Sequence, residues 1–490
     1  MTIRSRWSSE LAKFILPSFA QDWLHTTRPR PKKTHSTSYL DGLRGLAALA
    51  VLGYHFTDYN LKFFHPGYGV EESSSLLQLP YVRLLYAGKP MVHLFFVVSG
   101  FALSIRPLQQ LVAGQHDECQ ETLSSSIFRR PIRLLGPCLV LTFSLVFWAR
   151  AGYFLHYLKY QPTLWAQISD WSSDFFLRIA WPWSWDFGER PKYNVHLWTI
   201  PIELSHSYLL FLTILLIAHL RPTFRLPILI SIMKYTLQCG RWAAFEFIGG
   251  CLLAYIHIRQ EQDSEEETTK AQSLLWSIWH GLVNIILILM FLAGAFVMSW
   301  PTDFKQLPET YQFLVAHVPE PFANNASDFW FALSAFAVVG SIGHLRTLRQ
   351  CLELPFPQYL GRISFSLYIL QHPFLNLIQP YLMGAEARPA SGNQPAIPGW
   401  GLRGWPGVET WRQRVITWFI GWMIVVLLQI WLADMYTRWI DQPCVRLAKA
   451  AERWMCLQAD RQPERLGTEE KSLLTDQLRV NSEPSSDSPV

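Results

Sequence analysis

The chain has 490 residues, of which 50% are hydrophobic and only 16% are charged, and it contains 31 phenylalanines and 22 tryptophans. Soluble globular proteins carry about a quarter charged residues, so this composition excludes an ordinary soluble enzyme. The net charge of +5 is spread over many loops rather than gathered in one patch, so no nucleic-acid partner is expected.

Three regions of the chain differ in composition. Residues 1–38 are polar and basic, residues 39–448 carry repeated apolar stretches, and residues 449–490 are polar. The first region lacks an apolar core followed by small residues, so no cleaved signal peptide is predicted. We expect a basic cytosolic N-terminal tail, one transmembrane domain in contact with the lipid bilayer, and a mostly disordered cytosolic C-terminal tail.

Apolar stretches that can cross a bilayer recur along the central region. A transmembrane helix needs about 20 mostly apolar residues, and ten stretches meet or approach that length. They lie near residues 40–59, 90–106, 133–155, 197–219, 224–238, 241–259, 274–300, 329–344, 359–383 and 414–436. The sequence therefore predicts an all-α polytopic membrane protein, built as a bundle of about ten transmembrane helices.

The connecting loops predict the orientation of this bundle. Lysine and arginine near helix ends concentrate on the cytoplasmic side of a membrane. With the N-terminal run RPRPKK inside, alternating crossings place SIFRRPIRLLGP, HLRPTFR and HLRTLRQ inside as well, and both termini are cytosolic. An aromatic loop on the other side holds the sequon Asn325-Ala326-Ser327, so we expect glycosylation of Asn325. The expected location is the endoplasmic reticulum, another membrane of the secretory pathway, or the plasma membrane.

The first apolar stretch carries polar groups that lipid disfavours. Arg44 and His55 are eleven positions apart, so on a helix they leave nearly the same face, about 16 Å from each other along the axis. Asp41, Asp58 and Tyr59 extend this polar stripe. Ionisable groups inside a membrane usually line a path for a substrate or an ion.

The same stretch, LDGLRGLAALAVLGYHF, resembles the first-helix motif of the acyltransferase-3 family of integral membrane acyltransferases. Five further motifs of that family follow in the family's order across residues 38–448. They are LFFVVSGFALS (94–104), FRRPIRLLGP (128–137), LWTIPIELSHSYLLF (197–211), LGRISFSLYILQHPF (360–374) and WIDQPCVRLAK (439–449). The resemblance thus covers nearly all of the predicted membrane region.

The chain departs from the family pattern near the end of the fifth motif. Gln371 occupies the place where the family usually has histidine, and His372 follows one position later, turned by about 100° around a helix. His93, just before the second motif, is not a fixed family residue, and we expect it to be a polar residue at a helix start.

The resemblance implies transfer of an acyl group, often acetyl, from an acyl-CoA to a hydroxyl or an amine. A hydroxyl is a poor nucleophile until a base removes its proton, and a neutral imidazole suits that task. His55 is the candidate for this base, or for a transient acyl carrier. Asp58 or Glu203 would orient the imidazole, although either carboxylate can equally cap or line a helix end.

The donor CoA is polyanionic and needs cationic groups on the cytosolic face. Arg44, Arg130 and Arg133 meet that requirement, provided that the last two approach the first helix. The alternative is that the arginines of the third motif only enforce the topology.

The path between donor and acceptor is expected to involve further residues of the stripe and the motifs. Ser99 either lines a thioester channel or belongs to a close helix contact with the next glycine. The tryptophans of the loop before residue 198 stack on a flat acceptor or anchor the protein at the interface. The predicted path residues are Asp41, Tyr59, Ser99, Trp198 and His372.

The expected acceptor is a small molecule, a lipid or a carbohydrate, with a secondary metabolite among the small molecules. The seven cysteines show neither CxxC spacing nor a metal-ligand pattern, so we expect no disulfide framework and no metal. The alternative function is a transporter in which Arg44 and His55 form a solute or proton path. The sequence shows no inverted repeat that would favour the transporter.

Overall fold

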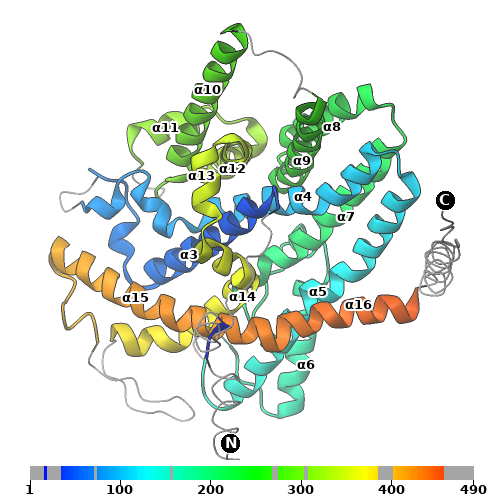
Figure 1. Ribbon diagram of the computed structural model, residues 1–490. Helices are drawn as coiled ribbons and strands as arrows, with labels where there is room; N and C mark the ends of the chain where they lie inside the picture. The colour runs from blue at the N-terminus through cyan, green and yellow to red at the C-terminus, as the bar shows by residue number, and fades with distance from the viewer. Residues whose placement is uncertain are drawn as a thin grey trace, which may run out of the picture.

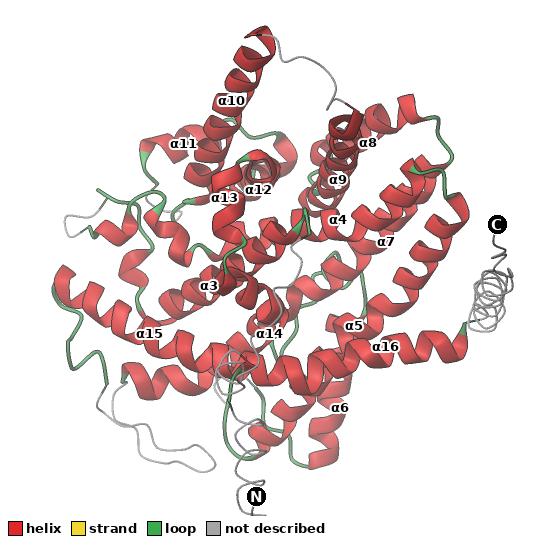
Figure 2. Cartoon of the chain, viewed as in Figure 1, coloured by secondary structure: helices red, strands yellow, loops and turns green. Residues whose placement is uncertain are grey.

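The computed structural model describes residues 16–18, 35–70, 74–154, 158–266, 274–302, 307–384 and 401–456. Every regular element in these ranges is helical, which confirms the all-α prediction (Figures 1 and 2). Most of the predicted tails, 1–38 and 449–490, lies outside the described residues. The long helices are α3 (Ser38–Asn60), α4 (Gly88–Val112), α5 (His116–Arg150), α7 (Thr199–Ala218), α8 (Pro222–Gln238), α9 (Trp242–Glu266), α10 (Leu274–Met298), α12 (Ala326–His344), α14 (Pro355–Met383), α15 (Trp411–Tyr436) and α16 (Gln442–Met455).

Short helical segments connect the long helices. They are η1 (Lys62–Phe64), η2 (Leu76–Gln78), η3 (Val82–Tyr86), α6 (Leu164–Asp174), η4 (Phe175–Ala180), η5 (Val195–Trp198), α11 (Glu309–Ala316), η7 (Glu320–Phe322), α13 (Arg346–Leu352) and η8 (Thr437–Asp441). Three of them, η1, η3 and η5, border the ends of α3, α4 and α7.

Six helical segments of the described chain are long and apolar enough to cross a membrane. They are Gly88–Val112, His116–Arg150, Val195–Ala218, Gly281–Met298, Ala326–His344 and Trp411–Met455. Of the other predicted spans, α8 is short at 17 residues, while α3, α9 and α14 are long enough but too polar. The protein is therefore a helical membrane protein, and ten crossings with cytosolic termini stay a prediction.

The structure corrects two predicted boundaries. The arginine-rich segment before residue 133 was expected to be a loop, but it belongs to α5, which begins at His116 and contains Pro131 and Pro137. The helix persists because its polar first half is rich in residues that tolerate helical conformation. At the other end, α16 continues to Met455, beyond the domain boundary predicted at 448.

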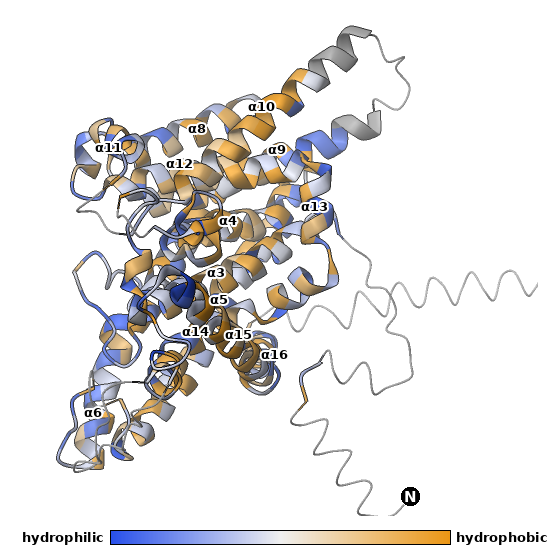
Figure 3. Ribbon diagram, turned by 90° about the vertical axis from the view of Figure 1, so that its left-hand side faces the viewer, coloured by the Kyte–Doolittle hydropathy of each residue, from blue (hydrophilic) through white to orange (hydrophobic). Residues whose placement is uncertain are grey.

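The polar helices occupy the centre of the bundle. α3 packs along α14 and α4, and α4 packs along α9, with α8, α10 and α12 on one side and α5, α15 and α16 on the other (Figures 1 and 3). Figure 3 shows that the ribbon of the outer helix α10 is coloured largely as hydrophobic, and many of its apolar side chains are exposed. Neighbouring helices therefore flank α3, while the polar side chains at its two ends, Asp41 and Asp58, remain partly exposed.

Glycines bring the central helices to backbone contact. An added Cβ would lie 2.4 Å from the Gly361 nitrogen at Gly45, and 2.3 Å from the Asp41 carbonyl oxygen at Gly361. At the crossing of α4 and α9, a Cβ at Gly100 would lie 2.2 Å from the Phe247 carbonyl oxygen. Small residues allow such close helix packing in membranes.

Two clusters of buried side chains hold the bundle. The first joins α4, α9, α12 and the core-facing side of α7 to the first half of α3. The second joins the rest of α3 to α5, α14 and α15. α3 thus contributes side chains to both clusters, as do α5 and α7.

The close contact between α3 and α14 predicts that alanine destabilises the protein at Gly361 but not at an open glycine. Gly361→Ala places a methyl group against the α3 backbone, so we expect a loss of about 1–3 kcal/mol of stability. The melting temperature of the detergent-solubilised protein measures this loss. Gly281→Ala is the matched control, because no atom lies within 4 Å of its added Cβ, and an unchanged melting temperature for Gly361→Ala would contradict the prediction.

Candidate active site

Three histidines from distant parts of the chain meet inside the bundle. The rings of His55 on α3 and His196 on η5 stack with centroids 3.7 Å apart and an interplanar angle of 22°. His372 on α14 contacts the other side of the group, its ring centroid 4.7 Å from that of His196 in a T-shaped arrangement. Gln371, the residue at the usual family position, is fully buried, and its amide has no hydrogen-bond partner within the described part of the chain.

Hydrogen bonds between η5 and α14 fix the position of His196. The Asn194 side chain accepts from the His196 backbone N–H and donates to the Ile369 carbonyl oxygen, at 3.2 and 2.8 Å. The Tyr368 hydroxyl donates to the His196 carbonyl oxygen and lies 2.6 Å from Thr199 Oγ1. η5 is therefore bonded to α14, and the His196 ring faces His55.

The histidines border a cavity of about 470 Å³. This volume is within the range of pockets that bind drug-sized ligands. Indole rings contribute much of its wall, and charged side chains lie between them. The lining includes Tyr54, His55, Lys89, His93, Trp185, Arg190, His196, Trp198, Trp242, Asn325, Asp328 and Tyr368.

The loop that carries Trp185 is bonded to the bundle. The Asp174 carboxylate accepts from the backbone N–H groups of Lys192 and Tyr193, at 2.9 and 3.1 Å. Burial raises the pKa of the Asp174 carboxyl, and these N–H groups oppose that rise. The Arg190 guanidinium lies 3.7 Å from the centroid of the Trp185 ring. The loop thus supplies a cation and an aromatic face to the cavity wall.

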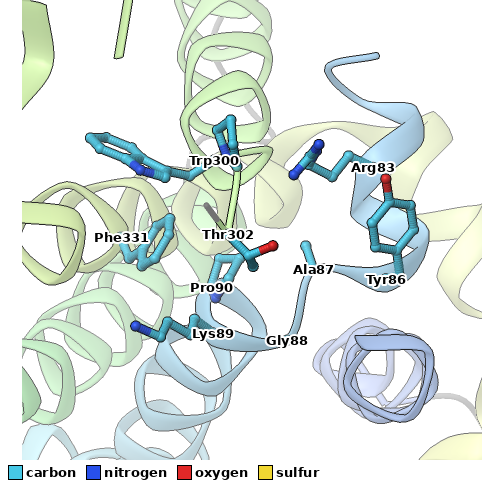
Figure 4. A pocket seen from close by; sticks show the side chains of 10 residues that line it. Arg83, Tyr86, Ala87, Gly88, Lys89, Pro90, Trp300, Thr302 and Phe331 are labelled. Carbon is cyan, nitrogen blue, oxygen red and sulfur yellow. The ribbon is translucent and has the colours of Figure 1, made fainter. Parts of the chain in front are cut away.

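A smaller pocket adjoins this cavity. Figure 4 shows Trp300 and Phe331 on one side of it and Arg83 on the other. The two spaces share Gly88 and Lys89 as lining residues. Its volume of about 20 Å³ admits no more than about one water molecule. Arg83 donates to three backbone carbonyls of the preceding loop, so it serves the structure of that loop.

A cationic cluster lies around the other end of the α3 stripe. Arg44 pairs with Asp41 at 3.3 Å, and its Nε donates to Ser364 Oγ on α14 at 3.1 Å. Arg44 also interacts electrostatically with Arg133 and with Asp441. The structure therefore brings the α5 arginines toward the first helix, as a shared anion site requires.

Arg130 and Glu203 form a buried pair in the same region. The Arg130 guanidinium donates to the Glu203 carboxylate, and its Nε donates to Ser207 Oγ at 2.7 Å. Glu203 therefore neutralises Arg130. Tyr368, which lines the cavity, interacts electrostatically with Glu203.

The remaining predicted residues lie apart from the histidines. Asp58 pairs with His65 at 3.3 Å, and Tyr59 donates to the Asn376 side chain at 2.5 Å. Neither Asp58 nor Glu203 has a hydrogen bond or an ion pair with His55 among the described residues. The carboxylates predicted to orient His55 thus contact other groups, and a second imidazole contacts it instead.

Of two further predicted residues, Ser99 lies outside the cavity wall and Asn325 lies in it. Ser99 precedes the glycine at the α4–α9 crossing and does not line the cavity. Asn325 is the N-cap residue of α12, is exposed, and lines the cavity. A glycan on Asn325 would therefore stand at the cavity rim.

Sequence reasoning missed two features of the cavity. One is His196, which directly precedes the family motif that begins at residue 197. Its place beside that motif was the only signal in the sequence that it could belong to the site. His93 was expected to be a polar residue at a helix start. It lies within α4, is 4% exposed, and its Nδ1 is 2.5 Å from Glu246 Oε1 on α9.

The imidazoles of His55 and His196 present ring faces to each other, so their in-plane nitrogens are directed toward other groups. No group of three potential metal ligands occurs among the described residues. A cavity with aromatic and charged lining, an imidazole that can act as a base and arginines around the other end of α3 together fit a membrane-embedded enzyme of the group-transfer class.

The chain belongs to the acyltransferase-3 family, since the family described as "Acyltransferase domain" matches residues 37–438. The protein is therefore an acyltransferase. It is 28% identical to the O-acetyltransferase PaAT-1 of Phomopsis amygdali over 92% of this chain and 90% of the relative. It is 23% identical to the acyltransferase R4 of a Phoma species, over 88% of this chain and 99% of the relative. No solved structure matches the chain.

The stacked pair predicts non-additive effects of substitution. If His196 acts through His55, then His196→Ala lowers kcat, while the double variant with His55→Ala is little slower than His55→Ala alone. Steady-state acyl transfer by the four proteins measures this coupling. His317→Ala, an exposed histidine after α11, is the control, and fully additive losses would contradict the prediction.

Proposed function

We propose that the protein is an O-acetyltransferase that transfers the acyl group of acyl-CoA to a hydroxyl of a small hydroxylated molecule. The observation that carries the proposal is the stacked His55–His196 pair in the wall of the 470 Å³ cavity. The name of one relative, an O-acetyltransferase, supports both acetyl transfer and an oxygen acceptor.

The chemical step that we propose uses His55 as a general base. His55 takes the proton of the acceptor hydroxyl as the oxygen attacks the thioester carbonyl. The tetrahedral intermediate collapses, the C–S bond breaks, and the CoA thiolate leaves and takes the proton from His55. The close contact with His196 disfavours a positive charge on His55, so the resting imidazole stays neutral and able to accept a proton.

The cations at the other end of α3 support acyl-CoA as the donor. Guanidinium groups bind phosphates well, and Arg44 and Arg133 interact within one electrostatic cluster. Asp441 and Glu203 balance that cluster when no anion is bound. The pantetheine arm of CoA then follows the stripe of α3 toward His55, a distance of about 16 Å along the helix. The predicted cytosolic termini place the phosphates on the cytosolic face.

The cavity supports a small, largely apolar acceptor. Its volume suits a drug-sized molecule, and Trp185, Trp198 and Trp242 offer flat apolar surface. A polymer chain would need an open groove, whereas this space is bounded by several helices and one loop. The family assignment also favours an enzyme over the transporter alternative.

A direct test measures CoA release and acyl product from acetyl-CoA with a library of hydroxylated terpenoids, polyphenols and alkyl glycosides. We expect product with small polycyclic alcohols and a fall in kcat of about 10²–10⁴-fold for His55→Ala. His317→Ala, outside the cavity, serves as the control. Undiminished turnover by His55→Ala would contradict the role of His55 as the base. Acetylated His55 found by mass spectrometry would establish the acyl-carrier role instead.

Replacement of Arg44 tests the donor site separately. Arg44→Lys keeps the charge but loses the planar fork of donors, so we expect the KM for acetyl-CoA to rise about tenfold with little change in kcat. Arg412→Gln, an exposed arginine at the start of α15, is the control. A lower kcat at unchanged KM would argue against a donor-binding role.

A further inference from the structure

A second histidine group lines the same cavity, and the proposed chemical step does not use it. His93 on α4 lies between Glu246 on α9 and Asp328 on α12. The Glu246 carboxylate is 0% exposed, and its Oε1 lies 2.5 Å from His93 Nδ1. His93 and Asp328 line the cavity, whereas Glu246 lies behind them.

Aromatic rings hold the His93 imidazole in place. The ring centroids of Trp242 and Phe331 lie 4.6 and 5.4 Å from that of His93. Because Nδ1 is directed to Glu246, the other ring nitrogen, Nε2, is the one that lies near Asp328. Nε2 is 3.9 Å from Asp328 Oδ1. A carboxylate that orients one ring nitrogen leaves the other available for a ligand.

The distance between these two atoms suits one bridging oxygen. An oxygen atom about 2.8 Å from both His93 Nε2 and Asp328 Oδ1 would subtend an angle of about 90°, which a hydroxyl accommodates. A hydroxyl can donate to one of these atoms while it pairs with the other. At 3.9 Å the two atoms do not hydrogen-bond directly.

The charges around the group favour a neutral ligand. Lys89 interacts electrostatically with both His93 and Asp328. Lys89 and Asp328 balance each other, and the Glu246 carboxyl lies behind His93 rather than in the cavity wall. An ammonium group would compete with Lys89 for Asp328, and an anionic group would meet the Asp328 carboxylate. A hydroxyl fits without adding charge.

The group belongs to a different part of the bundle from the catalytic pair. His93 and Glu246 stand on helices of the first core cluster, whereas His196 and His372 stand on elements that pack in the second. The cavity therefore has one histidine group from each side. A molecule held at His93 and Asp328 presents a different part of its surface to His55.

We propose that Glu246, His93 and Asp328 form a recognition site for a second hydroxyl of the acceptor, and that this site decides which hydroxyl is acylated. The inference rests on the proposed acyl transfer to a hydroxyl and specifies the acceptor as a diol or polyol. His93 and Asp328 are binding residues in this proposal, and Glu246 is a positioning residue that acts through His93.

The test uses the best polycyclic diol acceptor from the library described above, together with its mono-O-methyl ethers. The unaltered full-length protein should prefer the diol over the ether that lacks the second hydroxyl by about tenfold or more in kcat/KM. In His93→Gln and Asp328→Asn this preference should collapse toward one, through a higher KM for the diol, and the acetylated positions should become mixed. His317→Gln is the matched histidine control.

The readouts separate the possible outcomes. An unchanged diol preference and a single product isomer in both variants would overturn the inference, and so would a loss of kcat with every acceptor in folded protein. Asp328→Asn keeps the test decisive if His93→Gln does not fold, because Asp328 lies at the cavity surface. No acyl product from the unaltered protein with any acceptor would instead overturn the proposed function itself.

Discussion

The contact between α3 and α14 is the constraint on which the site depends. Gly45 and Gly361 let the two backbones touch, and no side chain fits between them. This contact sets the depth and rotation of α3 and so places Arg44 against Ser364 at one end. At the other end it brings His55 beside η5, which Tyr368 and Asn194 bond to α14.

Polar groups inside the bundle are tolerated because each is bonded or surrounded by protein. Arg130 pairs with Glu203, and His93 pairs with Glu246. Breaking a buried pair leaves an unpaired group that costs several kcal/mol, so these residues constrain the helices as well as the chemistry. The interior position of α3 and α14 also explains why these helices are less apolar than α10, whose side chains are largely exposed.

Much of the fold and part of the site could be predicted from the sequence. Helical spacing placed Arg44 and His55 on one face of α3, because that relation depends only on the local geometry of one helix. The contact of His55 with His196 could not be derived in this way, because it depends on how η5 docks on α14. The pairing of Glu203 with Arg130 likewise depends on the extension of α5 back to His116, in a segment whose arginines and prolines suggested a loop.

The division of the bundle into two core clusters has a consequence for how such enzymes diversify. The face with His55 and the face with His93 are packed largely by different sets of side chains. The two sets meet across the cavity and along α3, α5 and α7, which contribute side chains to both. Residues of α9 and α12, whose buried side chains belong to the first cluster, can therefore change without repacking the elements around His196 and His372. A lineage can then explore new acceptors by drift in one half of the bundle, while the reacting half is inherited intact.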